Sequence, residues 1–162
     1  REAVDVVLRY GRGDWFGMKS DLFLTEDIFP VCSPELLKGR YPLNEPADLR
    51  HHTLLHDDYF EDWTRWLLAA GVEGVESERG PVYEDSANIL QAAIAGEGVA
   101  LGRSALAADD LAAGRLVRVF NISLPREFAY YVVAPEASAD RPKVAAFRHW
   151  VIETAANDRL RN

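Results

Sequence analysis

Residues 80–102, GPVYEDSANILQAAIAGEGVALG, decide the fold of this chain. Residues 82–83 are typical of a strand end, and the pair 85–86 (DS) is of the kind that caps a helix by accepting backbone N–H bonds. The apolar residues that follow fall on one helical face: Ile89, Leu90, Ala93 and Ile94. Glycines at 96 and 98 end the helix, and the apolar run 99–101 is typical of a buried parallel strand. The stretch therefore predicts a strand-helix-strand unit.

A strand-helix-strand unit places the start of its helix at the carboxyl edge of a sheet. The first N–H groups of a helix have no partner within it, and together with the helix dipole they form a site for an anion or polar ligand. Residues 85–86 would lie at this point. The central stretch therefore predicts the position of a binding site as well as a local fold.

Composition limits the class of protein and the class of partner. The chain has 162 residues, 48% of them hydrophobic, which suffices for one cored unit or two small lobes. Its net charge of −8, with 18 basic and 26 acidic side chains, argues against a nucleic-acid or anionic membrane surface. Cys32 is the single cysteine, so neither an internal disulfide nor a structural zinc site is expected. We expect a soluble, cytoplasmic domain without a cofactor.

The remaining chain predicts further strands and helices in alternation. Extended runs are expected at 4–8, 22–31, 53–55, 116–120 and 128–133, the first of them buried. Helices are expected from Ser33-Pro34 to Gly39, over about 61–70, from a Ser104 cap through 111, and from Pro142 onward. Short turns marked by glycine or proline separate them. This order predicts an α/β fold with a mainly parallel sheet.

Six segments carry a family resemblance, in the same order along nearly the whole chain. They are VDVVLRYGRGDW (4–15), FPVCSPELL (29–37), WTRWLLAAG (63–71), VYEDSANILQAAIAGEGVALG (82–102), DLAAGRLVRVF (110–120) and YYVVAPE (130–136). Together they resemble the effector-binding domain of LysR-type transcriptional regulators. The RYGRGDW and PVCSP segments are most similar to the subgroup that contains the glycine-cleavage activator and the β-lactamase regulator.

The resemblance implies a two-lobed fold similar to type II periplasmic binding proteins. Lobe one would comprise residues 1–31 and 128–162, and lobe two residues 32–127. The first strand-helix-strand of lobe one and an N-terminal winged helix-turn-helix would precede residue 1. The family also implies a small-molecule effector and DNA binding through that N-terminal domain only. It further implies an isologous homodimer that pairs lobe one with lobe two, and a higher oligomer in the full-length protein.

The expected effector site lies in the cleft between the lobes, where strand ends and crossing segments meet. Its predicted residues are Arg9, Tyr10, Gly11, Cys32, Ser33, Asp85, Ser86 and Tyr130. Arg9 is included because a cation at the end of a buried strand needs a carboxylate or a bound anion, so a structural salt bridge is the alternative. Asp85 at the helix cap favours a ligand with an amine, such as an amino acid or peptide fragment. Tyr131 is an equal alternative to Tyr130.

Other functions have weaker support in the sequence. Gly96, Gly98 and Gly102 follow a helix instead of opening one, so they do not form a dinucleotide fingerprint. The segment 51–58 contains histidines and aspartates that would straddle a strand, which argues against a metal site. A Ser86-based hydrolase lacks the G-x-S-x-G turn. An enzyme or a solute-binding protein of similar α/β build is the alternative to a non-enzymatic sensor domain.

Overall fold

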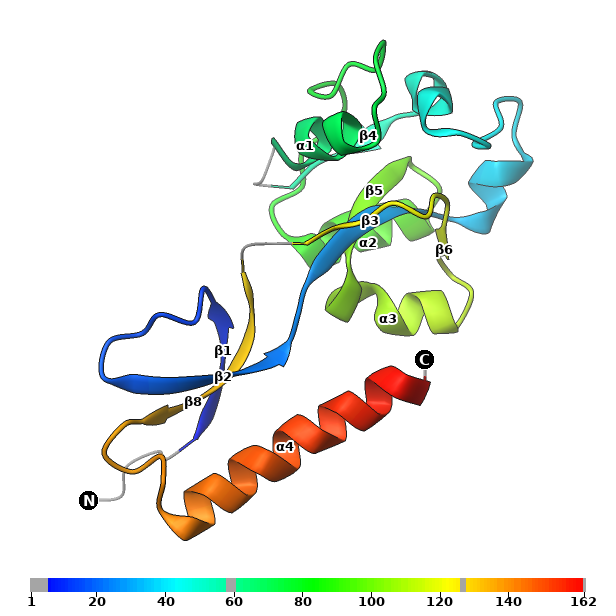
Figure 1. The fold of residues 1–162 in the computed structure, drawn as a ribbon. Coiled ribbons are helices and arrows are strands. Elements are labelled where there is room, and N and C mark those ends of the chain that lie inside the picture. The colour runs from blue at the N-terminus through cyan, green and yellow to red at the C-terminus, as the bar shows by residue number, and fades with distance from the viewer. Residues whose placement is uncertain (1–5, 58–60, 126–127, 162) are drawn as a thin grey trace. The chain divides into compact units, whose positions relative to one another are not determined.

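The computed structural model describes residues 6–57, 61–125 and 128–161, with side chains through residue 154. The chain divides into two compact units: unit 1 comprises residues 1–26 and 125–162, and unit 2 comprises residues 27–124 (Figure 1). The sequence predicts lobe boundaries near residues 31 and 128. The strand over 27–32 belongs wholly to unit 2 in the structure.

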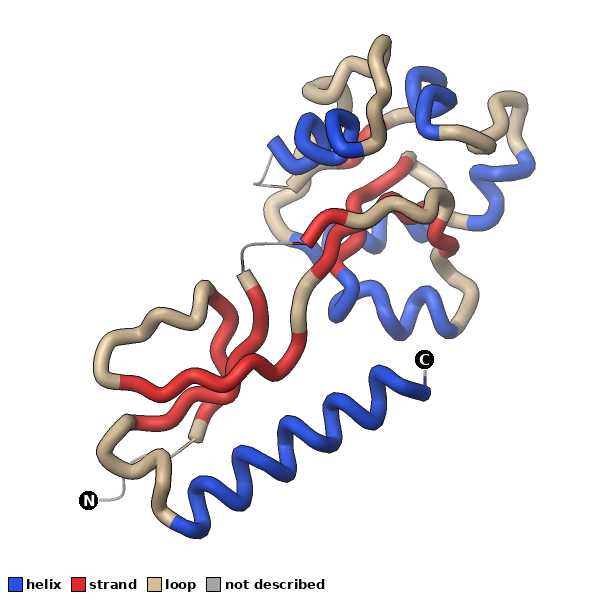
Figure 2. The backbone as a smooth tube through the Cα atoms, viewed as in Figure 1, coloured by secondary structure: helices blue, strands red, loops and turns tan. Residues whose placement is uncertain are grey.

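Unit 1 is a three-stranded antiparallel sheet with one long helix. Strands β1 (Val7–Gly11) and β2 (Met18–Leu24) both pair with the central β8 (Ala129–Pro135). Helix α4 (Pro142–Arg161) packs on this sheet, where Val144 meets Ala134 (Figure 2). Arg148 of α4 is buried and ion-paired with Asp21 of β2, and it donates a second bond to Ala139 O at 2.6 Å. This pair ties the helix to the sheet.

Unit 2 has a mixed sheet with strand order β4–β5–β3–β6. Its strands are β3 (Asp27–Cys32), β4 (Leu54–Leu55), β5 (Val99–Arg103) and β6 (Val117–Arg118), and β7 (Leu124–Pro125) also pairs with β3. Its helices are α1 (Glu61–Ala69), α2 (Ser86–Ile94) and α3 (Ser104–Ala112), with short 3-10 helices at Pro34–Lys38 and Pro46–His51.

Two apolar clusters fill unit 2. One joins α2 to β3 and β5 through residues that include Ile89, Leu90 and Ala100. The other contains Trp63 and Trp66 of α1, whose indole N–H groups donate to Leu55 O and Ile122 O, each at 3.0 Å. The tryptophan pair is therefore core.

The central strand-helix-strand prediction is confirmed. His56 and Val82 form an isolated parallel bridge beside β4, α2 follows, and the chain returns as β5, parallel to β4 on its other side. The first strand is thus reduced to a single bridge. Gly80 allows this close approach, because a Cβ there would lie 1.9 Å from Leu54 O at a φ of +114°.

The prediction of a mainly parallel sheet is wrong. β3 runs antiparallel to both β5 and β6, and every described ladder of unit 1 is antiparallel. The alternation of strands and helices along the chain suggested parallel neighbours, because parallel pairs need a helical crossover. Most strands here instead pair with partners that are distant in sequence.

Several predicted strands have different limits or surroundings. β1 is an edge strand with Val7, Leu8 and Arg9 exposed, so the prediction of a buried first strand is wrong where the structure describes it. The single extended run 22–31 is two strands in different units, and the run 116–120 contains only the two-residue β6.

The role predicted for Ser104 also changes. It is the first residue of α3, while Arg103 occupies the cap position. The Ser104 hydroxyl accepts a hydrogen bond from Asp27 N at 3.1 Å, so it ties α3 to β3 instead of capping its own helix.

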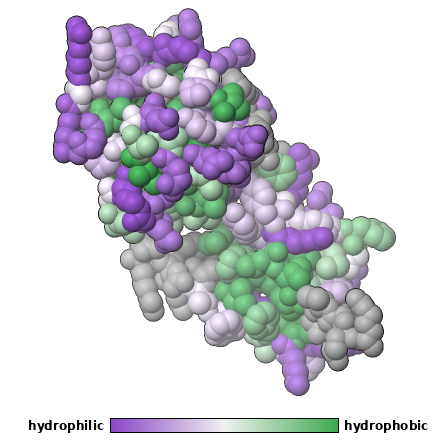
Figure 3. Space-filling view, turned by 180° about the vertical axis from the view of Figure 1, so that it is seen from behind, coloured by the Kyte–Doolittle hydropathy of each residue, from purple (hydrophilic) through white to green (hydrophobic). Residues whose placement is uncertain are grey.

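The surface of unit 1 is partly apolar. Figure 3 shows hydrophobic surface gathered on this unit, and its exposed apolar side chains include Leu8, Leu22, Phe147 and Trp150. In α4, Val144 is buried and Phe147 is exposed, so the apolar residues of this helix only partly face the core. Within the described ranges, each helix is too short or too polar to cross a lipid bilayer.

Candidate functional site: the carboxyl edge of unit 2

Three polar side chains of unit 2 meet where its parallel strands end. Asp57 follows β4, Arg103 is the last residue of β5, and Ser86 begins α2 just after the bridge at Val82. Parallel strands present their carboxyl ends at one edge of a sheet, so segments distant in sequence converge there. The edge therefore gathers a carboxylate, a guanidinium and a hydroxyl.

Asp57 is the centre of this group. Its Oδ2 accepts from Arg103 Nη2 at 3.3 Å and from Ser86 Oγ at 3.4 Å. The side chains of Arg103 and Asp57 are only 13% and 15% exposed, so the ion pair is largely shielded from water. Both hydrogen bonds lie at the long end of the usual range of donor–acceptor distances.

The start of α2 adds donors to this edge. Asp85 caps the helix, and its Oδ1 accepts from Asn88 N at 2.8 Å. The amide groups of Ser86 and Ala87 have no hydrogen-bond partner in the described part of the chain. The predicted capping by Asp85 is confirmed, and two N–H groups remain for water or a ligand.

Cys32 and Ser33 lie elsewhere in unit 2. The Cys32 side chain has 0% exposure and packs among Leu49, Leu54 and Trp66, and burial raises its pKa to about 11. The Ser33 hydroxyl accepts from Glu35 N at 3.2 Å and caps the first 3-10 helix. These contacts indicate packing and capping roles.

The predicted residues of unit 1 are divided between the two faces of its sheet. Tyr10 pairs with Tyr130 in register, and their ring centroids are 4.9 Å apart. Arg9 pairs with Tyr131, and successive side chains of a strand point to opposite faces. Arg9 and Tyr130 therefore lie on different faces, and Tyr131 is the tyrosine on the face of Arg9.

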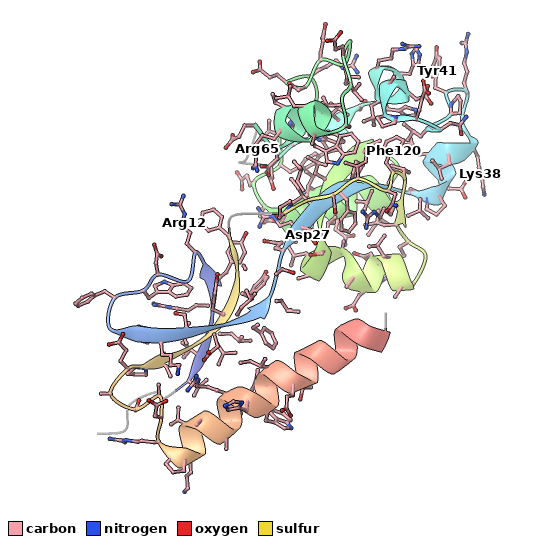
Figure 4. The ribbon with its side chains drawn as sticks, viewed as in Figure 1. Arg12, Asp27, Lys38, Tyr41, Arg65 and Phe120 are labelled. Carbon is pink, nitrogen blue, oxygen red and sulfur yellow. The ribbon has the colours of Figure 1, made fainter. Side chains whose placement is uncertain are left out.

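Each face holds its own aromatic group. On one face the Arg9 guanidinium carbon lies 5.4 Å from the ring centroid of Trp15, which packs edge-on against Tyr131. On the other, Arg12 lies over Phe128 at 5.4 Å (Arg12 is labelled in Figure 4).

Gly11 makes room for the first group, because a Cβ there would lie 2.6 Å from the Trp15 ring. The expectation that Arg9 ends a buried strand is wrong, since this cation is exposed and lies against an indole.

Sequence reasoning missed Arg103 and used Asp57 only as a metal-site alternative. Both stand at or just after the end of an apolar strand, and that position was a usable signal once β4 and β5 were known to be parallel neighbours. His56, from the same segment, is buried and donates from Nε2 to Arg79 O at 2.9 Å. The described ranges hold no group of three or more potential ligands arranged for a metal ion, and Asp58 lies outside them.

Comparisons with known proteins identify the class of domain. Residues 1–156 match the family model of the LysR substrate binding domain. The glycine cleavage system transcriptional activator of Escherichia coli K12 is 44% identical over 153 residues, which are 94% of this chain and 50% of that protein. The transcriptional activator AmpR of Pseudomonas aeruginosa is 31% identical over 156 residues, 96% of this chain and 51% of that one. The chain thus spans about half the length of these relatives.

Solved structures agree with the family match. The effector domain of the transcriptional regulator AmpR of P. aeruginosa superposes with a TM-score of 0.75 at 30% identity, over 98% of this chain and 77% of that one. The AmpR effector binding domain of Citrobacter freundii gives 0.76 at 24% identity, over 95% and 76%, which supports the fold.

These findings confirm the predicted two-lobed α/β fold of the periplasmic-binding-protein type. They also confirm the prediction that the chain is the ligand-binding domain of a regulator rather than an enzyme. The chain belongs to the LysR substrate-binding domain family.

Proposed function

We propose that this chain is the effector-sensing part of a cytoplasmic, homodimeric LysR-type transcriptional regulator. Its relatives are named as transcriptional activators, and the chain spans about half of each. DNA binding by the full regulator would belong to the part of those relatives that this chain does not span. The negative charge of the chain agrees with this division, because a net charge of −8 disfavours contact with the extended phosphate backbone of DNA.

We further propose that the effector is a zwitterionic small molecule, such as an amino acid or a peptide fragment. The observation that carries this proposal is the meeting of Asp57, Arg103 and Ser86 at one sheet edge, beside two amide groups without partners in the described part of the chain. A ligand that carries both an acid and an amine complements such a group.

Each residue has a distinct role in this proposal. The guanidinium of Arg103 and the amides of Ser86 and Ala87 hold the ligand's carboxylate, which the helix dipole also favours. The carboxylate of Asp85 is exposed and receives the ligand's amine. The Ser86 hydroxyl releases its long bond to Asp57 and turns to the ligand.

Tyr130 and Tyr10 share one face of the sheet of unit 1, so their two rings act as a pair. Arg9 lies against Trp15 on the other face, and Gly11 makes room for the Trp15 ring. We leave Cys32 and Ser33 out of the proposed site because the first is fully buried and the second is engaged as a cap.

Calorimetric titration with amino acids and cell-wall peptides tests the site. Ser86→Ala removes one neutral hydrogen bond and should weaken binding by about two- to ten-fold. Arg103→Met removes a charged donor and should weaken it by about ten-fold or more. Tyr130→Phe tests whether the hydroxyl of Tyr130 takes part in binding.

The matched control is Arg115→Met. Arg115 also pairs with an aspartate of unit 2, Asp110 at 2.7 Å, but away from the sheet edge. Circular dichroism confirms that each variant is folded, and recovery of the ligand unchanged separates a sensor from an enzyme. Equal affinity of wild type, Ser86→Ala and Arg103→Met for every ligand that binds would refute the site.

A further inference from the structure

A polar pocket lies at the opposite end of β4 from Asp57. Its lining residues are Arg50, His51, His52, Thr53, Arg79 and Gly80, and its volume is about 250 Å³. Thr53 immediately precedes β4, whereas Asp57 follows it, so the pocket and the sheet edge described above are separate places in unit 2. Tyr41, labelled in Figure 4, stacks on His51 beside the pocket with ring centroids 4.7 Å apart.

The pocket is basic in a chain that is acidic overall. Its lining holds two arginines and two histidines and no carboxylate among the described residues, while the chain carries a net charge of −8. Arg65, Arg103, Arg115 and Arg148 each pair with an aspartate. Arg50 and Arg79 have no carboxylate oxygen within 4.0 Å in the ranges that the structure describes. Their charge is therefore available to an anion.

Hydrogen bonds hold these basic side chains in place. Arg79 Nη2 donates to Arg50 O at 3.1 Å and to His52 O at 3.0 Å, which fixes its guanidinium across the segment that leads into β4. His56 Nε2 donates to the backbone carbonyl oxygen of Arg79 at 2.9 Å and so holds the backbone of that arginine.

Arg50 and the two pocket histidines are also fixed. Arg50 Nε donates to His51 Nε2 at 3.1 Å, and His52 Nε2 donates to Tyr41 O at 3.0 Å. These bonds are solvent-exposed, and each favours an orientation of a basic side chain at the pocket, which lowers the entropic cost of binding.

The nearby carboxylate Asp48 does not occupy the pocket. Its Oδ2 accepts from Asn44 N and Glu45 N at 2.9 and 3.1 Å. These bonds lower its pKa, and the charge of Arg50 lowers it further. Asp48 therefore stays ionised and offsets part of the positive charge, but it remains directed at its own backbone partners.

We propose that this pocket binds a phosphate group, either free or on a small monoester. Guanidinium groups match the tetrahedral oxygens of phosphate, and Thr53 adds a hydroxyl to the lining. The volume lies just below the range typical of drug-sized ligands, which suits a compact anion. The site is independent of the amino-acid site proposed above.

Isothermal titration of the chain with inorganic phosphate, at ionic strength held constant with sodium chloride, tests the proposal. Saturable binding is expected, and Arg50→Gln should weaken it about ten-fold or more, because a charged donor is lost. Arg141→Gln is the matched control: it removes an exposed arginine of unit 1 and should leave the affinity unchanged. A parallel titration with glycerol phosphate decides whether the free ion or a monoester is preferred.

Amide chemical shifts give a second readout. Phosphate should move the resonances of Thr53 and Gly80 in wild type and move them less in Arg50→Gln. Absence of saturable binding for both phosphates, or equal affinity in wild type and Arg50→Gln, would overturn the proposal. The effect of Arg103→Met on amino-acid binding tests only the proposed effector site, whereas Arg50→Gln tests only the phosphate pocket. Either proposal can therefore be refuted without the other.

Discussion

The ion pair between Asp57 and Arg103 should stabilise unit 2 by an amount that a double-mutant cycle can measure. At 3.3 Å and an effective dielectric constant of about 20, two unit charges attract by about 5 kcal/mol. The loss of hydration cancels much of this attraction, although side-chain exposures of 13% and 15% leave some water contact. We expect a net coupling energy between the two side chains of about 1–3 kcal/mol. Either single substitution should lower the free energy of unfolding by about 2–3 kcal/mol.

The cycle uses Asp57→Asn, Arg103→Met and the double variant, with unfolding by urea followed by circular dichroism. Glu35 and Lys38 provide a matched control pair in the same unit, with a 3.0 Å contact but side chains 76% and 71% exposed. Their coupling should be at most about 0.5 kcal/mol and should fall in 1 M salt. A coupling for Asp57 and Arg103 no larger than that of the control would refute the reasoning.

Three further outcomes are expected. Cys32 should react with thiol reagents at pH 8 only as fast as unfolding exposes it, and labelling as rapid as in urea would contradict its burial. Its pKa is raised to about 11 in the folded state, so the unfolded state loses the thiol proton first. The free energy of unfolding of wild type should therefore fall relative to that of Cys32→Ala as the pH rises from about 8.5 towards about 11. Gly80→Ala should lower the free energy of unfolding, measured in urea, by at least about 2 kcal/mol. Gly74 also has a positive φ but has open space around it, so Gly74→Ala should lower the free energy by only about 1 kcal/mol. Equal losses in the two variants would disprove the clash at Gly80. Sedimentation equilibrium should show a homodimer, because unit 1 exposes apolar side chains such as Leu8 and Trp150, and a monomer at high micromolar concentration would exclude it.

Local signals in the sequence predicted local structure well. The caps at Ser33 and Asp85 form hydrogen bonds to the expected N–H groups, and α1 and α2 begin and end within a residue or two of their predicted limits. Capping chemistry and helical spacing act over a few residues, so they can be recognised without knowledge of the fold. The family resemblance then supplied the arrangement that such signals do not contain.

The pairing of strands and the composition of the site were harder to predict. Neither the antiparallel partner of β3 nor the edge position of β1 follows from its own residues, since both depend on segments far along the chain. Arg103 was missed because its importance comes from its neighbours at the sheet edge, Asp57 and Ser86. The separation of Arg9 from Tyr130 likewise depends on the register between β1 and β8, which alternation within one strand does not fix.

The order in which the chain passes through the two units affects how the protein folds. Unit 2 is one continuous segment, whereas unit 1 joins the two ends of the chain, with β1 and β2 flanking β8. Its ion pair links Asp21 to Arg148, which are 127 residues apart in sequence. During synthesis, unit 2 emerges from the ribosome before β8 does, so β1 and β2 wait without their central strand until the end of the chain emerges. Early translation therefore exposes two unpaired strands, and a sequence change that slows the folding of unit 2 prolongs that exposure.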